Sequence, residues 1–384
     1  MLIGIVGCPN SGKSTMFKAL TLADAEIADY PFTTIKPNEG IGYVTTPCAC
    51  RRLNVKCNPK NSQCIGGIRH IPVKILDVAG LVPGAHEGKG LGNQFLDDLR
   101  QASGLIHVLD VSGRTNPEGK PDHWDPEKTI DILEDEIDEW IAGIIKRSFK
   151  KIETLSRTQR KPMEKLLAQQ LSGLGICEEH IKRVINSGIT LSEENIKTFA
   201  TELRKVSKPI IIAANKIDLP EAEKNLEKLR KHGEVVPCCA EAELALKEAA
   251  RHDLIKYIPG DSKFEIISDE LNEKQKRALE FIKNILERFG STGVQQCLNK
   301  LVFDMLSYIV VYPVANIGKL SDNQGNILPD AYLVPKGTTL KELASMIHTD
   351  IAESFIGGLD LNRKKLGADY ELKDGDVIEI LFKK

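Results

Sequence analysis

Residues 7–14 read Gly-Cys-Pro-Asn-Ser-Gly-Lys-Ser, which matches the pattern G-x-x-x-x-G-K-[ST] of phosphate-binding loops. The apolar run Leu2–Val6 precedes the loop and predicts a buried strand, and residues 15–20 favour a helix. A loop between a strand and a helix offers backbone N–H groups and the positive end of the helix dipole to an anion. The sequence therefore predicts an α/β fold of the P-loop NTPase class.

The residue types in and after this loop suit a nucleotide with its magnesium ion. Lys13 would reach the β and γ phosphates, and the Ser14 hydroxyl would bind Mg²⁺. Thr34, in a loop with two prolines, and Asp77, in the run Asp-Val-Ala-Gly after a strand, are further candidate magnesium ligands. The Gly80 N–H would meet the γ phosphate. The nucleotide-binding residues expected in the first loop are Asn10, Ser11, Gly12, Lys13, Ser14 and Thr15.

A second motif predicts which base is bound. The apolar run 209–214 predicts a strand, and Asn215-Lys216-Ile217-Asp218 follows it directly. A carboxylate on Asp218 can accept hydrogen bonds from both the N1–H and the N2 amine of guanine, a donor pair that adenine lacks. Lys216 would pack over the base, and Asn215 would brace the loops. After the next strand, Cys239 and Ala240 would complete the base site, with the Ala240 N–H facing the guanine O6.

Together these motifs resemble the Obg-related, translation-factor-class GTPases, close to their YchF-like branch. The matching segments are G-C-P-N-S-G-K-S, Y-P-F-T-T-I-K-P-N, D-V-A-G-L-V-P-G-A-H-E-G-K-G-L-G-N-Q-F-L, N-K-I-D and A-E-A-E-L. The resemblance covers residues 1 to about 118 and 205 to 384. It implies a doubly wound G domain, dependence on Mg²⁺, and a role with the ribosome or RNA.

Three departures from the family pattern bear on activity. YchF lacks a guanine-type tetrad and prefers ATP, whereas this chain has Asn215, Lys216 and Asp218, so GTP is favoured. Cys239 stands where the family usually has serine. Leu81 follows Gly80 where many small GTPases have a glutamine that orients water, and an aliphatic side chain cannot do so.

Hydrolysis must therefore use another group, and slow turnover is expected. By analogy, Asn10 could coordinate a K⁺ ion placed like an arginine finger, with Lys13 completing the catalytic charge. His107 aligns with a histidine proposed as catalytic in the YchF group, but it lies on an apolar strand, and this position favours a structural histidine over a catalytic one. His86, in the glycine-rich loop after Gly80, is a further candidate.

Four of the nine cysteines lie close together in the sequence, at positions 48, 50, 57 and 64. Four thiolates could form a tetrahedral zinc site, although only one residue separates Cys48 from Cys50 where two to four are usual. Internal disulfides and free thiols are the alternatives.

Residues 119–204 interrupt the predicted G domain. Ile130, Leu133, Ile137, Ile141 and Ile144 recur at helical spacing and predict an amphipathic helix over 129–150. Its outer face is expected to hold Asp131, Glu134, Asp135, Glu136, Asp138 and Glu139. Residues 146–165 then contain eight basic residues, which could contact a phosphate backbone or form an ordinary solvated face.

The C-terminal part predicts a separate small domain. Alternating runs at 308–312, 331–334 and 377–381 suggest strands, and 339–347 predicts a single helix capped by Thr338 or Thr339. L-V-P-K-G-T-T, F-I-G-G and L-K-D-G-D-V-I-E-I resemble a TGS β-grasp domain, whose families are linked to RNA and ribosomes. The expected division is 1–118 and 205–304 for the G domain, 119–204 for the helical insertion, and 305–384 for the β-grasp domain.

Composition limits the remaining possibilities. The 52 basic and 54 acidic residues give a formal charge of −2, so contact with nucleic acid would need a local patch. No apolar run is long enough to span a membrane and no signal segment is evident, so a cytoplasmic location is expected.

We therefore expect a Mg²⁺-dependent GTPase that binds GTP and GDP and acts as a slow molecular switch with the ribosome or RNA. One alternative is an ATPase like its YchF relatives. The other is a nucleotide-gated RNA- or ribosome-binding factor whose hydrolysis is incidental.

Overall fold

The computed structural model describes residues 1–22, 38–80, 84 and 92–383. These residues form two compact units. The first comprises residues 1–22, 38–40, 74–80, 84 and 92–301, and the second comprises 41–73 and 302–383. Residues 41–73 thus cluster with the C-terminal residues, whereas the sequence analysis assigned them to the first part of the G domain. Thr34, Leu81 and His86 lie outside the described residues.

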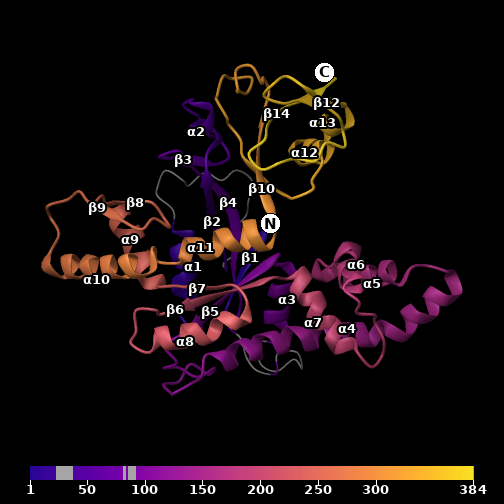
Figure 1. The fold of residues 1–384 in the computed structure, drawn as a ribbon, viewed down its shortest axis with the longest axis horizontal. Helices are drawn as coiled ribbons and strands as arrows, with labels where there is room; N and C mark the ends of the chain where they lie inside the picture. Colours follow the sequence, from indigo (N-terminus) through magenta and orange to yellow (C-terminus); the bar gives the residue numbers. More distant parts are fainter. Residues whose placement is uncertain (23–37, 81–83, 85–91, 384) are drawn as a thin grey trace. The chain divides into compact units, whose positions relative to one another are not determined.

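The largest sheet of the described residues is largely parallel, and its strands β1, β5, β6 and β7 lie in the first unit (Figure 1). Its strand order is β2 (Glu39–Pro47), β4 (Ile68–Asp77), β1 (Leu2–Val6), β5 (Gly104–Asp110), β6 (Ile210–Asn215) and β7 (Val235–Pro237). β1 pairs in parallel with both β4 and β5, and β5, β6 and β7 continue in parallel. Every residue of β5 is buried, as expected for a strand covered on both faces.

Helices cover both faces of this sheet (Figure 1). They are α1 (Lys13–Thr21), α3 (Gly92–Gln101), α8 (Ala222–Leu229), α9 (Ala240–Arg251), α10 (Glu273–Phe289) and α11 (Val294–Asn299). Two short strands, β8 (Ile255–Tyr257) and β9 (Phe264–Ile266), form a separate antiparallel pair. This is the doubly wound P-loop fold that the sequence predicted.

The insertion consists of α4 (Glu127–Gln159), α5 (Met163–Leu171), a 3₁₀ turn (Ser172–Leu174), α6 (Glu178–Asn186) and α7 (Ile196–Ser207). α4 includes the expected helix and continues to Gln159, where Arg160 adopts a left-handed conformation with φ 51°. Leu133, Ile137 and Ile141 pack into one core with Leu105 of the sheet and Phe199 of α7. The insertion therefore shares a hydrophobic core with the G domain.

The prediction that Glu136 and Asp138 lie on the outer face of this helix was wrong. Glu136 is 6% exposed and Asp138 4% exposed, because partners from other segments reach them. The Arg204 Nε of α7 donates to Asp138 Oδ1 at 2.6 Å, and Thr201 donates to the same carboxylate. Helical spacing alone did not reveal these partners.

One buried lysine fastens the end of the insertion to the sheet. Lys208 is 2% exposed, and its ammonium donates to Ala102 O at 2.7 Å and Arg100 O at 3.4 Å. These carbonyls lie at the C-terminal end of α3, where a cation is favoured. Burial lowers the pKa of Lys208 to about 8. The chain thus enters β6 at a position fixed by polar contacts as well as packing.

The second unit contains a five-stranded sheet with one long side covered by α12. The strand order is β11 (Tyr332–Pro335), β10 (Tyr308–Val314), β14 (Val377–Phe382), β12 (Phe355–Leu359) and β13 (Lys365–Leu366). α12 (Leu340–Ile347) buries Leu340 and Leu343 in this core, and α13 (Thr349–Glu353) follows. The Thr339 side chain accepts from the Glu342 N–H, so Thr339 is the cap. The predicted β-grasp is confirmed.

Two elements of the same unit come from early in the chain. α2 (Ala49–Leu53) and β3 (Gln63–Ile65) are joined by a loop that pairs with residues 327–331. The Asn58 N–H donates to Ile327 O at 2.8 Å, and the Lys60 N–H donates to Pro329 O at 2.7 Å. The Lys60 ammonium also pairs with Asp322 at 2.6 Å. No described helix is long and apolar enough to cross a membrane.

The contact between α4 and α7 generates a stability prediction. Replacing Arg204 by methionine leaves the buried Asp138 carboxylate without its cation, and the free energy of unfolding should fall by about 3–5 kcal/mol. Lys197→Met is the matched control, because Lys197 pairs with Glu139 on the same two helices but is 56% exposed, and this change should cost under about 1 kcal/mol. Denaturant unfolding followed by circular dichroism measures both. Equal losses would contradict a special role for the buried pair.

Candidate nucleotide-binding site

The loop after β1 has a backbone that few residues can adopt. Gly12 has φ 94° and Asn10 has φ 62°. A Cβ atom on Gly12 would lie 2.2 Å from Asn215 Nδ2, so a side chain there is excluded by space as well as by conformation. The Met16 N–H donates to Gly12 O at 2.9 Å and begins α1 at the loop. The loop therefore ends at a helix N-terminus, as anion binding requires.

Lys13 and Asp77 lie together at this edge of the sheet. The Lys13 ammonium contacts the Asp77 carboxylate directly and donates to Val78 O at 2.9 Å. The strands explain this contact, since Ile5 of β1 is in register with Asp77 of β4. Ser14 is exposed on the first turn of α1. A hydroxyl and a carboxylate are hard oxygen donors of the kind that Mg²⁺ prefers, so these residues fit a magnesium ion.

Asn215 joins three loops. Its Nδ2 donates to Ser11 O at 2.9 Å, and its Oδ1 accepts from the Ala240 N–H at 2.9 Å. The side chain is only 4% exposed, so water does not compete for these hydrogen bonds. One amide therefore connects the phosphate loop, the end of β6 and the turn after β7.

Lys216 is held by a residue that the sequence analysis missed. Lys216 has φ 65°, and its ammonium pairs with Asp110 Oδ2 at 2.8 Å. Burial acts to raise the pKa of Asp110, but hydrogen bonds from Lys216, Ser112 and Thr115 outweigh it and lower the pKa. Asp110 is the last residue of β5 and is in register with Asn215. Its position at the end of a predicted strand could have indicated this role from the sequence.

The Asp218 carboxylate has the Cys239 thiol as a partner. The Cys239 Sγ donates to Asp218 Oδ1 across 3.4 Å. Burial, reinforced by the Asp218 charge, raises the pKa of Cys239 to about 12, which keeps the thiol protonated as a donor. Cysteine can therefore occupy the place of the usual serine, because both side chains offer one donor.

The Ala240 N–H was expected to face the guanine O6. In this structure it donates to Asn215 Oδ1 instead. A guanine oxygen at this point would have to share the N–H or displace the amide oxygen. The sequence motif identified the position but not this competing partner.

Residues 291–293 support the turn after β7, and no motif indicated them. The Cys239 N–H donates to Thr292 O at 2.9 Å, and the Thr292 hydroxyl donates to the buried Glu243 carboxylate of α9. Tyr257 also donates to Glu243, at 2.7 Å. Gly293 has φ 81°, and a Cβ there would lie 1.9 Å from Pro237 O. The turn therefore rests on a glycine that cannot be replaced without moving backbone.

The side chain of His107 is buried against the sheet and does not reach solvent. The side chain is 0% exposed and its strand neighbour is Val6 of β1. Burial lowers the pKa of His107 to about 4, so the ring is neutral, and neither ring nitrogen has a partner among the described residues. This placement favours the structural interpretation of His107 over a direct role with a water molecule.

The basic segment of the insertion is well exposed. All eight basic residues of 146–165 are exposed: Lys146, Arg147, Lys150, Lys151, Arg157, Arg160, Lys161 and Lys165. Within the described part of the chain, Arg157 pairs with Glu153 and Lys150 with Glu193. The other six have no ion pair with any described residue. These eight residues are called the basic patch below.

Three family models match the chain. Residues 2–155 match the 50S ribosome-binding GTPase model, residues 213–316 match the Obg-like GTPase YGR210-like, G4 motif-containing domain, and residues 324–382 match the TGS domain. A GTP-binding protein of Methanocaldococcus jannaschii is 53% identical, with 99% of this chain and 98% of that protein covered. The chain belongs to the YchF-related Obg-like GTPases. As a member of this family it is a P-loop hydrolase.

Two further relatives are similar to this Obg-like GTPase over nearly the whole chain. The crystal structure of a GTP-binding protein from Pyrococcus horikoshii OT3 has a TM-score of 0.79, with 37% identity and full coverage of both chains. The protein named ribosome-binding ATPase YchF of Buchnera aphidicola is 27% identical, with 99% of this chain and 98% of that protein covered. The sequence predicted a P-loop GTPase domain and a C-terminal TGS domain, and the family models confirm both.

A substitution at Gly293 tests whether this glycine supports the turn after β7. Gly293→Ala should displace residues 237–239 and weaken binding of a fluorescent GDP analogue by more than about tenfold, since the base contacts depend on a buried hydrogen-bonded turn. Gly290→Ala is the matched control: its φ is also positive, at 78°, but no atom lies within 4 Å of an added Cβ. It should cost stability only, about 1 kcal/mol. Unchanged GDP affinity in Gly293→Ala would contradict the support role.

Proposed function

We propose that this Obg-like GTPase is a Mg²⁺-dependent switch that hydrolyses GTP slowly to GDP and phosphate and acts with the ribosome or RNA. The observation that supports this most directly is the Asn215 amide, which connects the phosphate loop to the turn containing Cys239 and Ala240. Phosphate binding and base binding thereby share one rigid contact. The assembled tetrad favours GTP as the nucleotide.

The choice of guanine rests on Asp218. Its carboxylate is half-buried and fixed on one side by the Cys239 thiol. A guanine ring supplies two N–H donors to the carboxylate, whereas adenine would leave the charge without a partner. The competing proposal is ATP hydrolysis, which the name of the YchF relative supports.

Lys13 and Asp77, at the phosphate end of the site, would change partners when GTP binds. Phosphate oxygens compete with Asp77 for the Lys13 ammonium, and release of the Asp77 carboxylate makes it available to a cation. Ser14 and Asp77 would hold Mg²⁺, with Thr34 as a further ligand in our proposal. When bound, the ion neutralises charge on the phosphates.

Asn10 is suited to bind a further cation during hydrolysis. Its Nδ2 donates to Gly119 O at 2.8 Å, and this fixes the amide with its oxygen directed elsewhere. The Asn10 oxygen accepts no hydrogen bond within the described part of the chain. A K⁺ ion would fit such an oxygen, and we propose this role in place of a water-orienting glutamine. Lys13 supplies a further positive charge to the phosphates during hydrolysis.

The insertion is connected to the region that the γ phosphate would control. The Gly84 N–H donates to Glu136 of α4, and the Ala79 N–H donates to Asp98 of α3 at 3.3 Å. A shift of Gly84 would change its hydrogen bond to Glu136. The nucleotide state could thereby alter α4, the helix that bears part of the basic patch.

Association with the ribosome or RNA is proposed from two independent features. Six residues of the basic patch have no ion pair with a carboxylate among the described residues, and phosphate backbones bind surfaces with such free positive charge. A relative over nearly the full length of the chain is named a ribosome-binding ATPase. The TGS domain is a second candidate contact. A cytoplasmic location agrees with this proposal.

Asp218→Asn tests the base specificity. Loss of the charged acceptor should weaken GTP and GDP binding by more than about tenfold, corresponding to the 1.5–3 kcal/mol of a hydrogen bond to a charged group. Xanthosine nucleotides should gain affinity relative to GTP. Competition of GTP, ATP and XTP against a fluorescent GDP analogue measures all three. Equal competition by ATP and GTP in the wild-type protein would support the ATPase alternative.

Charge reversal tests the basic patch. The triple variant Lys151→Glu, Arg160→Glu and Lys161→Glu should reduce ribosome or RNA binding at least about tenfold and flatten its salt dependence, since counterion release is lost. The control is Lys274→Glu, Arg277→Glu and Lys283→Glu, which makes the same charge change on exposed positions of α10. Co-sedimentation with ribosomes at several salt concentrations compares them. Equal binding by the two variants would exclude the patch as the contact.

A further inference from the structure

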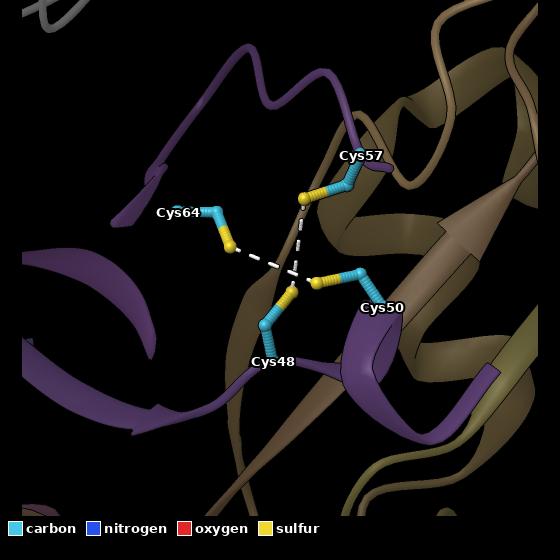
Figure 2. Close-up of side chains that lie close together, drawn as sticks. All are labelled: Cys48, Cys50, Cys57 and Cys64. Carbon is cyan, nitrogen blue, oxygen red and sulfur yellow. Dashed lines mark hydrogen bonds between the residues drawn. The ribbon is translucent and has the colours of Figure 1, made fainter. Parts of the chain in front are cut away.

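Four cysteine side chains in the second unit converge on one point (Figure 2). They are Cys48, Cys50, Cys57 and Cys64, and their sulfur atoms all lie within 4.8 Å of one another. The Cys48 and Cys57 sulfurs are 4.0 Å apart, and the Cys50 and Cys64 sulfurs are 3.7 Å apart. A disulfide needs about 2.05 Å. All nine cysteines are free thiols in this structure, which removes the disulfide alternative.

The separations fit one metal ion at the centre. Zinc–sulfur bonds of about 2.3 Å in a tetrahedron place the sulfurs about 3.8 Å apart. A multi-iron cluster would need a wider opening, because several iron and sulfide ions must fit between the thiolates. The four sulfurs therefore match a mononuclear site.

Local structure explains how an unusual spacing reaches this geometry. Cys48 is extended, with φ −71° and ψ 142°, and stands immediately before α2, whereas Cys50 is inside the helix. The change from extended to helical backbone turns the two side chains toward the same point (Figure 2). Asn54 then ends the helix in a left-handed conformation, and the chain returns through Cys57 to Cys64 on β3.

A buried cation lies beside the cysteines. Arg69 of β4 is in register with Cys64 of β3, so the two side chains share one face of the strand pair. Arg69 is 0% exposed, and its Nε and Nη1 have no hydrogen-bond partner within the described residues.

Other contacts do not neutralise this guanidinium. Nη2 donates to the Leu328 carbonyl, and the group lies over the Tyr312 ring at 5.3 Å. The charge of Arg69 influences Asp330, but the two residues form no ion pair. A buried charge without an opposite charge is costly. Four thiolates around one divalent cation leave a net negative site, which would supply that opposite charge.

We propose that Cys48, Cys50, Cys57 and Cys64 bind a structural zinc ion, with Arg69 as its buried countercharge. All four ligands come from the chain and Cys48 and Cys50 are nearly fully buried, so the site is closed and has no open position for a substrate. The ion fixes the loop whose Asn58 and Lys60 N–H groups pair with Ile327 and Pro329. Zinc therefore fastens residues 48–64 to the β-grasp fold. This proposal is independent of nucleotide specificity.

Elemental analysis of the full chain, purified with zinc supplied throughout, gives the first test. About one zinc ion per chain is expected, and Cys50→Ser and Cys64→Ser should each lose most of it, since a structural site needs all four ligands. Cys177→Ser is the matched control because Cys177 is a free, exposed cysteine in the insertion, and its zinc content should equal that of the wild-type protein. Absence of metal, iron in place of zinc, or zinc retained by the two ligand variants would overturn the proposal.

Measurements on the wild-type protein avoid variants that fail to fold. Cobalt added after zinc removal should give the thiolate-to-metal absorption of a tetrahedral site, saturating at one equivalent. Zinc removal should accelerate hydrogen exchange at the Asn58 and Lys60 N–H groups at least tenfold, while the Leu105 N–H, paired with Pro209 in the first unit, keeps its rate. Arg69→Gln should lower zinc affinity at least about tenfold, against no change for the exposed Arg51→Gln. No cobalt absorption and unchanged exchange would show that the thiols remain free.

Discussion

The side-chain amide of Asn215 is the contact on which the nucleotide-binding edge depends. It has one donor and one acceptor group, and both are used, toward Ser11 O and the Ala240 N–H. Parallel strands bring the loops after β1, β6 and β7 to the same edge, but nothing in strand pairing fixes those loops relative to one another. A buried amide does so, because a buried polar group loses free energy unless each hydrogen bond is made with good geometry.

Buried charges hold the surrounding helices and turns in place. Asp110 pairs with Lys216, and Glu243 accepts from Thr292 and Tyr257 next to the turn after β7. The pair of Arg204 and Asp138 joins α7 to α4. Among the described residues, the Lys208 ammonium donates only to carbonyl oxygens, and its lowered pKa reflects the cost of a charge in a buried environment. Such groups contribute little net stability over apolar packing, but they penalise any arrangement that separates them. They therefore specify positions as much as they stabilise the fold.

In the second unit, too, polar contacts and a buried charge fix a segment in place. Its loop between α2 and β3 has few apolar side chains with which to form a core of its own, yet it lies against residues 327–331 through backbone hydrogen bonds. Arg69 is completely buried there beside four thiols. A small segment of this kind gains order from a cross-link more readily than from hydrophobic burial. A metal centre would explain both the buried Arg69 guanidinium, which has no ion pair with a described residue, and the convergence of the four sulfurs.

The sequence by itself indicated β1, β5 and β6, the pattern of the phosphate loop, the tetrad at residues 215–218 and the capped helix of the β-grasp, because each depends on local spacing and residue type. It did not indicate β2, β3, β8, β9, β12 or β13. It could not determine the partners of Asp138, Glu136 and Lys216, nor the support that Gly293 gives to the turn after β7. Those contacts join residues tens to hundreds of positions apart. Helical periodicity placed Asp138 on the surface, whereas tertiary packing brought Arg204 to it. Only the fold decides which charges become buried, since burial depends on neighbours from distant segments that local spacing does not encode.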